Sequence, residues 1–322
     1  MYGSWQYFKL DKRNWKRFRM SLVSKIEEIK KNFPGQILLN ENLSKYSWFN
    51  LGGPAKIIFK PKNLNDLSSF LKRSKELGKV QVLGAGSNTL IRDGGFDGVI
   101  IKLGKTFSHI SLLDKNTVIA GSSVFDKNLS NFGLDNSISG FEFLSCIPGT
   151  IGGGIRMNSG CYGEDISKIL ISVQTMDLNG NLKIIYSSDI KFSYRKCNLD
   201  NNLIFISATF RGKISKKDNI KKKINELVAK KKKDQPSKIK TCGSTFINPQ
   251  NSKAWKLIKE SGCAGMKIGD AYISEKHCNF FVNKGNAKSL DLEKLISKVK
   301  KIVLDKTGIK LDLELQIIGD NL

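Results

Sequence analysis

The stretch "VQVLGAGSNTLIRDGG", residues 80–95, joins an apolar strand-like run to a turn rich in glycine. A strand ending in G-x-G can open a Rossmann unit, where a third glycine lets a helix pack on the strand. Here the third glycine is absent, and another glycine turn follows instead of a helix, which argues against that fold. Bare glycines before Ser87 and Asn88 still suit a phosphate, because they open backbone N–H groups to it. A plain tight turn is the alternative on this stretch alone.

The sequence around this turn alternates strand and helix patterns. Strands are indicated at residues 56–61 and 98–103 by runs of apolar residues. Between them, an apolar face with helical spacing predicts a helix that starts after Asn63 and stops at Gly78. A further strand and a short helix are expected over residues 116–133. This alternation indicates an α/β unit.

A second glycine-rich stretch, "GFEFLSCIPGTIGGGIRMNSGCYG", covers residues 140–163 with seven glycines. So much glycine indicates backbone that lies close against a bulky group. Two separate glycine walls suit an extended dinucleotide such as FAD. Beyond them, "NGN" at 179–181 predicts a hairpin turn between two strands, and a third strand is expected at 203–212.

The last hundred residues suggest a separate unit. A Lys-rich helix over 215–233 leads to Pro236, which marks a plausible boundary. Helices are expected at 251–262 and 289–307. The final segment, 310–319, alternates leucine with polar residues, which predicts a strand with Glu314 on its polar face.

Composition limits the classes of function. The formal net charge is +25, but the lysines are scattered along all 322 residues, which favours anionic small ligands over nucleic acid. No apolar run is long enough for a membrane span. Six cysteines without a C-x-x-C pair favour a reducing cytosol. Residues 1–19 are aromatic and basic without periodicity and are interpreted as a loose tail or an upstream start.

The chain contains, in this order, "SWFNLGGPA", "VLGAGSNTLIRDGGFDGVII", "GFEFLSCIPGTIGGGIRMNSGCYG", "FSYRKC", "CGSTFINP", "ISEKHCNFFVN" and "LELQIIG". This ordered set resembles the UDP-N-acetylenolpyruvoylglucosamine reductase family over residues 43–319. The resemblance implies an α+β fold of the FAD-binding PCMH, or vanillyl-alcohol-oxidase, type, with two α/β subdomains around FAD and a C-terminal α/β substrate domain. The expected boundaries are a tail and helix at 1–42, FAD-binding subdomains at 43–105 and 106–213, and a substrate-binding domain at 214–322.

The resemblance also implies an activity. NADPH would reduce noncovalent FAD, and the flavin would reduce UDP-N-acetylglucosamine enolpyruvate to UDP-N-acetylmuramate, a step of peptidoglycan synthesis, in a cytoplasmic and monomeric enzyme. The family match makes Arg195 and Glu314 catalytic and makes Ser244 the proton donor. A guanidinium suits a substrate carboxylate better than an ammonium, because its fork is planar. Without the resemblance, an ordinary salt bridge explains Arg195 equally well and an exposed sheet face explains Glu314 equally well, while a turn or a cap is the favoured interpretation of Ser244.

The remaining expected contacts follow the same motifs. For FAD they are Gly84, Ala85, Gly86, Ser87, Asn88, Pro148, Gly149, Thr150, Gly153 and Gly154. For the substrate they are Asn158, Tyr194, Lys231, Lys232 and Asn248. The two lysines stand where the family commonly shows arginines, so they supply the charge without the fork.

Several alternatives stay open at this point. An oxidase on the same fold is one, although many oxidases tether flavin through a histidine and residues 84–95 contain none. A basic nucleic-acid-binding protein is another. His277 is interpreted as structural, and two histidines with unpaired cysteines offer no metal set. Nothing between residues 212 and 242 leaves room for the inserted tyrosine loop of one family branch, so the chain resembles the branch without it.

Overall fold

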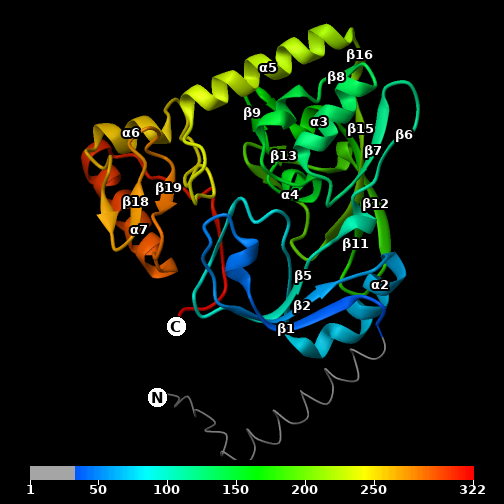
Figure 1. Cartoon of the computed structure of the whole chain (residues 1–322), viewed down its shortest axis with the longest axis horizontal. Helices are drawn as coiled ribbons and strands as arrows, with labels where there is room; N and C mark the ends of the chain where they lie inside the picture. The colour runs from blue at the N-terminus through cyan, green and yellow to red at the C-terminus, as the bar shows by residue number, and fades with distance from the viewer. Residues whose placement is uncertain (1–32) are drawn as a thin grey trace, which may run out of the picture.

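The computed structural model describes residues 33–322, so the expectations for residues 1–32, the tail and the helix pattern after Met20, lie outside the described part of the chain. A mixed sheet forms the base of the molecule, with strand order β1-β2-β5-β3 (Figure 1). Its three strands β2, β5 and β3 are parallel, and β1 pairs antiparallel with β2. The strands are β1 (Gln36–Asn42), β2 (Pro54–Lys60), β3 (Lys79–Val82) and β5 (Phe96–Ile101).

Helix α2 (Leu64–Arg73) connects β2 to β3 and covers one face of this sheet. The Asn63 side chain accepts a hydrogen bond from the Asp66 N–H at 2.9 Å, which confirms the predicted start of the helix. Phe70 on its buried face stacks on Phe59 of β2, with ring centroids 3.8 Å apart. The segment ends at Gly78, whose φ of 95° suits a residue without Cβ.

A second sheet, antiparallel throughout and of order β12-β11-β15-β7-β6, stands beside the first. Its β11–β12 pair is the hairpin that the "NGN" turn predicts. The strands are β6 (Ile110–Leu112), β7 (Thr117–Gly121), β11 (Leu170–Met176), β12 (Leu182–Tyr186) and β15 (Ile204–Arg211). Helices α3 (Asp126–Asp135) and α4 (Ile151–Arg156) pack on it. The second glycine stretch, residues 140–163, begins after α3 and includes α4.

Helix α5 (Lys217–Asp234) spans the top of the molecule and leads to the C-terminal unit (Figure 1). That unit packs α6 (Ala254–Glu260) and α7 (Ser289–Thr307) around a three-stranded sheet. The sheet has the order β17-β18-β19, with β17 (Lys267–Ile268), β18 (Ala271–Ile273) and β19 (Phe281–Asn283). The predicted 289–307 helix is confirmed to the residue.

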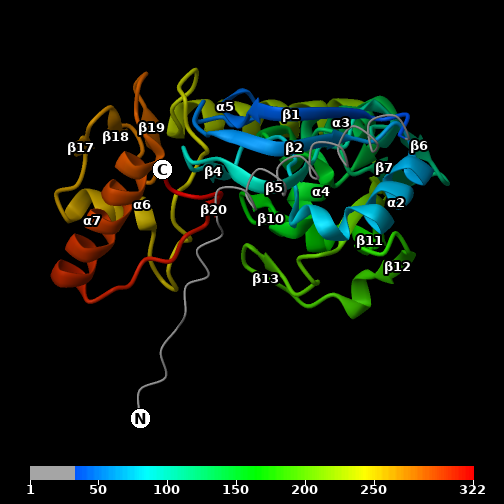
Figure 2. The same ribbon diagram turned by 90° about the horizontal axis from the view of Figure 1, so that it is seen from below.

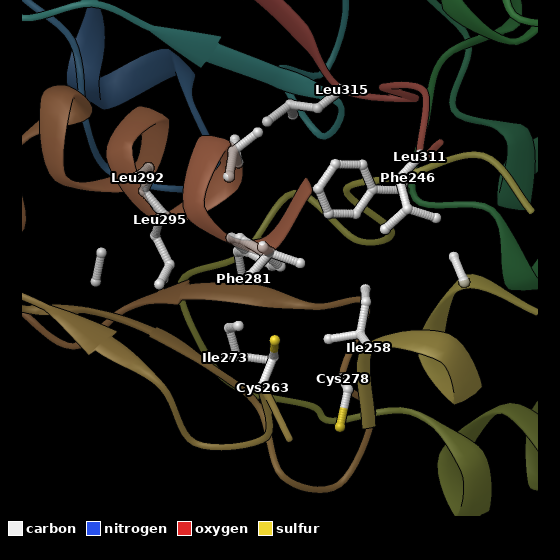
Figure 3. Close-up of a cluster of buried hydrophobic side chains, with 14 of the residues drawn as sticks. Phe246, Ile258, Cys263, Ile273, Cys278, Phe281, Leu292, Leu295, Leu311 and Leu315 are labelled. Carbon is white, nitrogen blue, oxygen red and sulfur yellow. The ribbon is translucent and has the colours of Figure 1, made fainter. Parts of the chain in front are cut away.

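The hydrophobic core of the C-terminal unit includes residues from the part of the chain around the first sheet. Figure 3 shows Phe246, Phe281 and Leu295 in this cluster, where the rings of Phe246 and Phe281 meet edge to face with centroids 5.7 Å apart. Phe49, Leu51 and Leu90, which belong to the part of the chain around the first sheet, are buried in the same cluster. Continuous apolar packing of this kind resists separation of the two units.

The final strand is much shorter than the sequence predicts. Only β20 (Gln316–Ile318) is a strand, and it pairs in parallel with β4 (Thr89–Ile91) next to the first glycine turn. Both strands lie side by side in Figure 2. Leu311 and Leu315 are buried as expected. Before β20, however, Thr245 O accepts from the N–H groups of Glu314 and Leu315, and the Asn88 side chain donates to Glu314 O, so no named strand of the described chain pairs with residues 314 and 315. An alternating pattern reports two faces, and it does not show which partner covers them.

Short two-residue strands complete the structure. They pair as β16 with β8, β10 with β9, and β13 with β14. Their bounds are β8 (Ile138–Ser139), β9 (Gly160–Cys161), β10 (Glu164–Asp165), β13 (Phe192–Ser193), β14 (Lys196–Cys197) and β16 (Lys213–Ile214). Within residues 33–322, no helix combines the length and the apolar composition that crossing a bilayer requires.

Candidate active site

The first glycine turn, residues 84–88, follows β3 at the carboxyl edge of the parallel strands. Its backbone N–H groups donate to no acceptor in the described part of the chain. Gly86 has a φ of 68°, and a Cβ there would overlap the carbonyl oxygen of Tyr46. Free N–H groups on a tight turn of this kind form an anion-binding concavity. The turn therefore has the chemistry that a diphosphate requires.

The second glycine stretch lies against the first. A Cβ on Gly84 would come within 2.7 Å of Thr150 Oγ1, so the two walls touch at this point. The N–H groups of Ile151 and Gly152 donate to Val124 and Ser122, so this wall is bound to the second sheet. Of the expected FAD contacts, Gly84, Ala85, Gly86, Ser87 and Asn88 form the first wall, and Pro148, Gly149, Thr150, Gly153 and Gly154 form the second.

A buried carboxyl group, that of Asp126, packs against two glycines of the second wall. Asp126, the first residue of α3, is fully buried, and neither of its carboxyl oxygens has a hydrogen-bond partner in the described chain. A Cβ on Gly149 would lie 2.6 Å from Asp126 Oδ2, and one on Gly154 would lie 3.3 Å from Oδ1. Burial raises the pKa of Asp126 to about 8. The group is therefore largely protonated at neutral pH.

The structure brings Arg195 and Glu314 together from segments that are 119 residues apart. Arg195 Nε donates to Glu314 Oε1 at 2.8 Å, and Arg195 Nη2 donates to the carbonyl oxygen of Gly160 at 2.8 Å. Both side chains are mostly buried, at 18% and 17% exposed. Burial raises the pKa of Glu314, although Arg195 opposes the shift. Arg195 Nη1 has no partner within residues 33–322, so it remains available to an anion.

The backbone at Arg195 is strained. Its φ of 59° lies in the left-handed region, in the tight turn between β13 and β14. An arginine held there costs about 1–2 kcal/mol, and such strain is concentrated at functional sites. Asn158 supports the turn, because its buried amide donates to Ser193 O at 3.1 Å and accepts from the Ser167 N–H at 3.0 Å. The structure thus gives Asn158, which the sequence assigns to the substrate, contacts inside the protein.

Ser244 lies near Glu314, because the next residue, Thr245, is hydrogen-bonded to the backbone of Glu314. The carbonyl oxygen of Thr245 accepts hydrogen bonds from the N–H groups of Glu314 and Leu315, at 3.0 and 3.3 Å. The hydroxyl of Ser244 has no hydrogen-bond partner among the described residues. Cys242 is buried, and its thiol donates to the carbonyl oxygen of Gly86 at 3.5 Å. The "CGST" segment therefore lies between the glycine turn and Glu314.

The other expected substrate residues fall into two groups. Tyr194 and Asn248 are joined, because Asn248 Nδ2 donates to the Tyr194 hydroxyl at 3.1 Å. Lys231 lies at the second wall, where its Nζ donates to Cys146 O at 2.8 Å. The side chain of Lys232 is exposed, and no contact in the described chain joins it to the site.

Two features of the site had no signal in the motifs. One is the carbonyl oxygen of Gly160, which orients Arg195, and backbone atoms carry no sequence signature. The other is Lys102, which follows β5 and donates to the carbonyl oxygen of Gly84. Among the many lysines of this chain, only its position after a parallel strand, at the same edge as the glycine turn, could have singled it out.

Sequence comparisons with known proteins agree on one family. Residues 55–185 match the model of an FAD binding domain, and residues 235–318 match the C-terminal domain of UDP-N-acetylenolpyruvoylglucosamine reductase. A curated reductase of that name from Pelagibacter ubique is 51% identical over 299 residues, which is 91% of this chain and 99% of the relative. One from Rickettsia canadensis is 44% identical over 88% of this chain and 96% of the relative.

A solved structure extends the agreement to the fold. The UDP-N-acetylenolpyruvylglucosamine reductase of Thermus caldophilus superposes with a TM-score of 0.77 at 29% identity, covering 88% of this chain and 99% of that one. The α+β fold expected from the sequence is thereby confirmed. Two glycine walls in an FAD-binding domain, joined to the matching C-terminal domain, leave one assignment: this chain belongs to the UDP-N-acetylenolpyruvoylglucosamine reductase family.

Proposed function

We propose that this protein uses NADPH and FAD to reduce the enolpyruvyl ether of UDP-N-acetylglucosamine enolpyruvate to UDP-N-acetylmuramate. The observation that carries the proposal is the Arg195–Glu314 pair beside the "CGST" segment and the first glycine turn. In the proposed division of the chain, residues 43–105 and 106–213 hold FAD and residues 214–322 hold the substrate. One chain supplies both parts, which supports a monomer, and the six free thiols support the cytoplasm.

The residues present fit FAD. The free N–H groups of residues 84–88 suit the diphosphate, and the second wall, with Thr150 next to Gly84, encloses the other side. When bound, FAD would take hydride from NADPH and supply it to the methylene carbon of the enolpyruvyl group. The protein must then stabilise the charge that develops on the carboxylate side and protonate the adjacent carbon.

Arg195 is suited to the first of these tasks. Glu314 and Gly160 O hold two of its three nitrogens, so the planar group is fixed while Nη1 stays open toward a carboxylate. A guanidinium that is already oriented stabilises developing negative charge without reorganising. Glu314 in this proposal orients the arginine and polarises the substrate.

Ser244 is suited to the second task. Its hydroxyl is uncommitted, and the backbone of the next residue, Thr245, is hydrogen-bonded to Glu314, the residue that binds Arg195. In the proposal the positive charge of Arg195 favours the loss of a proton from this weak acid. In the proposal Ser244 gives its proton to the carbon next to the carboxylate and recovers it from water. Tyr194, Asn248, Lys231 and Lys232 are proposed to bind the UDP-sugar.

Two measurements on the purified protein test the proposal. The visible spectrum should show the bands of bound flavin, and acid precipitation should release all of the colour, since the FAD is noncovalent. In a stopped-flow experiment NADPH should bleach the flavin, and the UDP-enolpyruvyl sugar should restore it. A colourless protein that takes up no FAD would refute the proposal, and a flavin that the UDP-sugar cannot reoxidise would refute the substrate.

A further inference from the structure

Two lysines converge on the first glycine turn from the parallel strands next to it. Lys60 is the last residue of β2 and Lys102 follows β5. Phe59 is paired with Ile101 and Val82 with Ile101, so Lys60, Lys102 and the start of the turn lie level at one edge. This is the carboxyl edge, where open α/β sheets bind their ligands.

Lys102 contacts the glycine turn, and the charge of Lys60 acts on Lys102. Lys102 Nζ donates to the carbonyl oxygen of Gly84. Both ammonium groups lie near the ring of Tyr46, with Lys60 Nζ 5.5 Å and Lys102 Nζ 5.9 Å from its centroid. The carbonyl oxygen of Tyr46 is also the atom against which Gly86 packs. Lys60, Lys102 and the glycine turn therefore all lie around Tyr46.

The charge at this place is not balanced by the protein. Within residues 33–322, neither Lys60 nor Lys102 has a carboxylate within ion-pair distance. Burial, together with the charge of Lys60, lowers the pKa of Lys102 to about 8. Two partly buried like charges raise the free energy of the protein unless an anion lies between them. An anionic ligand would remove this cost.

We propose that Lys102, assisted by Lys60, binds a phosphate of the FAD diphosphate and sets the affinity for the cofactor. The inference rests on the proposed function, since it takes FAD as the ligand. The diphosphate is favoured over the substrate's own phosphates because both lysines lie in residues 55–185, which match the FAD binding domain, and Lys102 contacts the turn itself. Charge-assisted hydrogen bonds to phosphate are about twice as strong as neutral ones.

The test measures the dissociation constant of FAD from the apoprotein by the quenching of flavin fluorescence. Lys102→Gln keeps a hydrogen-bond donor for Gly84 O but removes the charge, and it should weaken FAD binding by roughly 10- to 100-fold. Lys102→Arg keeps the charge and should stay within about fivefold of the wild-type protein. Lys60→Gln should give a smaller loss. Lys79→Gln, at the opposite edge of the same sheet, is the matched control and should bind FAD normally.

The outcomes separate the two claims. FAD affinity in Lys102→Gln equal to that of the wild-type protein overturns the inference and leaves the proposed function standing. Equal losses in Lys102→Arg and Lys102→Gln also overturn it, because the side chain would then act through its shape and not through its charge. A wild-type apoprotein that does not bind FAD refutes the proposed function, and the inference with it.

Discussion

At the scale of single residues, the site depends on groups held in conformations that cost free energy. Arg195 is kept in the left-handed region, and Asp126 is buried without a hydrogen-bond partner. Neither arrangement stabilises the fold. Arg195 lies at the proposed active site and Asp126 lies directly behind a glycine wall. Active sites commonly keep such destabilising groups because function requires them.

Ser244 gives the most direct residue-scale prediction. Ser244→Ala should leave the reduction of the flavin by NADPH unchanged, because in the proposed mechanism its hydroxyl acts only on the substrate. Reoxidation by the UDP-sugar should slow by roughly 10²- to 10⁴-fold, the usual contribution of a positioned acid. Stopped-flow absorbance of the two half-reactions measures both effects. Equal slowing of both would mean that Ser244 serves FAD binding or folding.

Asp126 predicts a pH dependence of stability. Its pKa is raised in the folded protein by burial, so the unfolded chain loses the proton at lower pH than the folded one. The folded state then binds more protons between about pH 4 and pH 8, and the free energy of unfolding falls as pH rises through that window. Asp126→Asn should remove this fall, worth a few kcal/mol at about 1.4 kcal/mol per pKa unit.

Urea unfolding between pH 5 and pH 8 checks this prediction. The gain in stability of Asp126→Asn over the wild-type protein should increase with pH across the series. Asp135→Asn, exposed at the other end of the same helix, is the control and should show no such trend. A constant difference between Asp126→Asn and the wild-type protein would show that ionisation of this carboxyl does not couple to folding.

At the scale of elements, adding a single methyl group can probe the contact between the two glycine walls. Gly84→Ala should lower stability by about 1–3 kcal/mol and weaken FAD binding, because the new Cβ meets Thr150 Oγ1 at 2.7 Å. Thr150→Ala removes that oxygen, so the double variant should lose less than the sum of the single variants.

Thermal unfolding and FAD titration of the four proteins in this cycle provide the measurement. Gly104→Ala serves as the control, since a Cβ there meets nothing within 4 Å, and it should not destabilise the protein. Strict additivity of the Gly84 and Thr150 effects would mean that the two walls do not touch in solution.

Much of this architecture is readable from the sequence, and particular elements show why. Asn63, Gly78 and the "NGN" turn act through contacts with near neighbours, so helix α2 and the β11–β12 hairpin were predicted correctly. The predicted strand at 310–319 is too long, because the backbone of residues 314–316 is bound by Asn88 and Thr245. Both residues are far away in the chain. The resemblance named Arg195 and Glu314 separately, and only the structure shows that they pair, since local periodicity contains no information on a partner 119 residues away.

At the scale of the whole molecule, the proposed site depends on how the C-terminal unit docks on the first sheet. Arg92 Nε and Nη2 donate to the two carboxylate oxygens of Glu293 at 2.8 Å each. Next to them, Asp93 accepts hydrogen bonds from both the N–H and the hydroxyl of Ser289, at the start of α7. These contacts join the turn after β4 to the C-terminal unit, and the shared core adds to them.

Arg92→Met should weaken this docking. We expect a loss of about 1–2 kcal/mol in the free energy of unfolding, more than an exposed pair gives, because the pair is bidentate and partly buried. Urea denaturation provides the number. Lys56→Met breaks the exposed Lys56–Asp97 pair within the first sheet and should cost less than about 1 kcal/mol. Equal effects of both variants would mean that the Arg92 pair adds nothing to docking.

The parallel pairing of β20 with β4 has a practical consequence for anyone who wishes to dissect the protein. A flavin-binding fragment that ends near residue 213 would lose the strand that covers β4, together with the apolar residues that bury Leu90. Its bare strand and uncovered leucines would recruit other copies, so we expect such a fragment to aggregate when expressed alone. Affinity tags for purification are for the same reason better placed at the N-terminus, away from the last residues after β20.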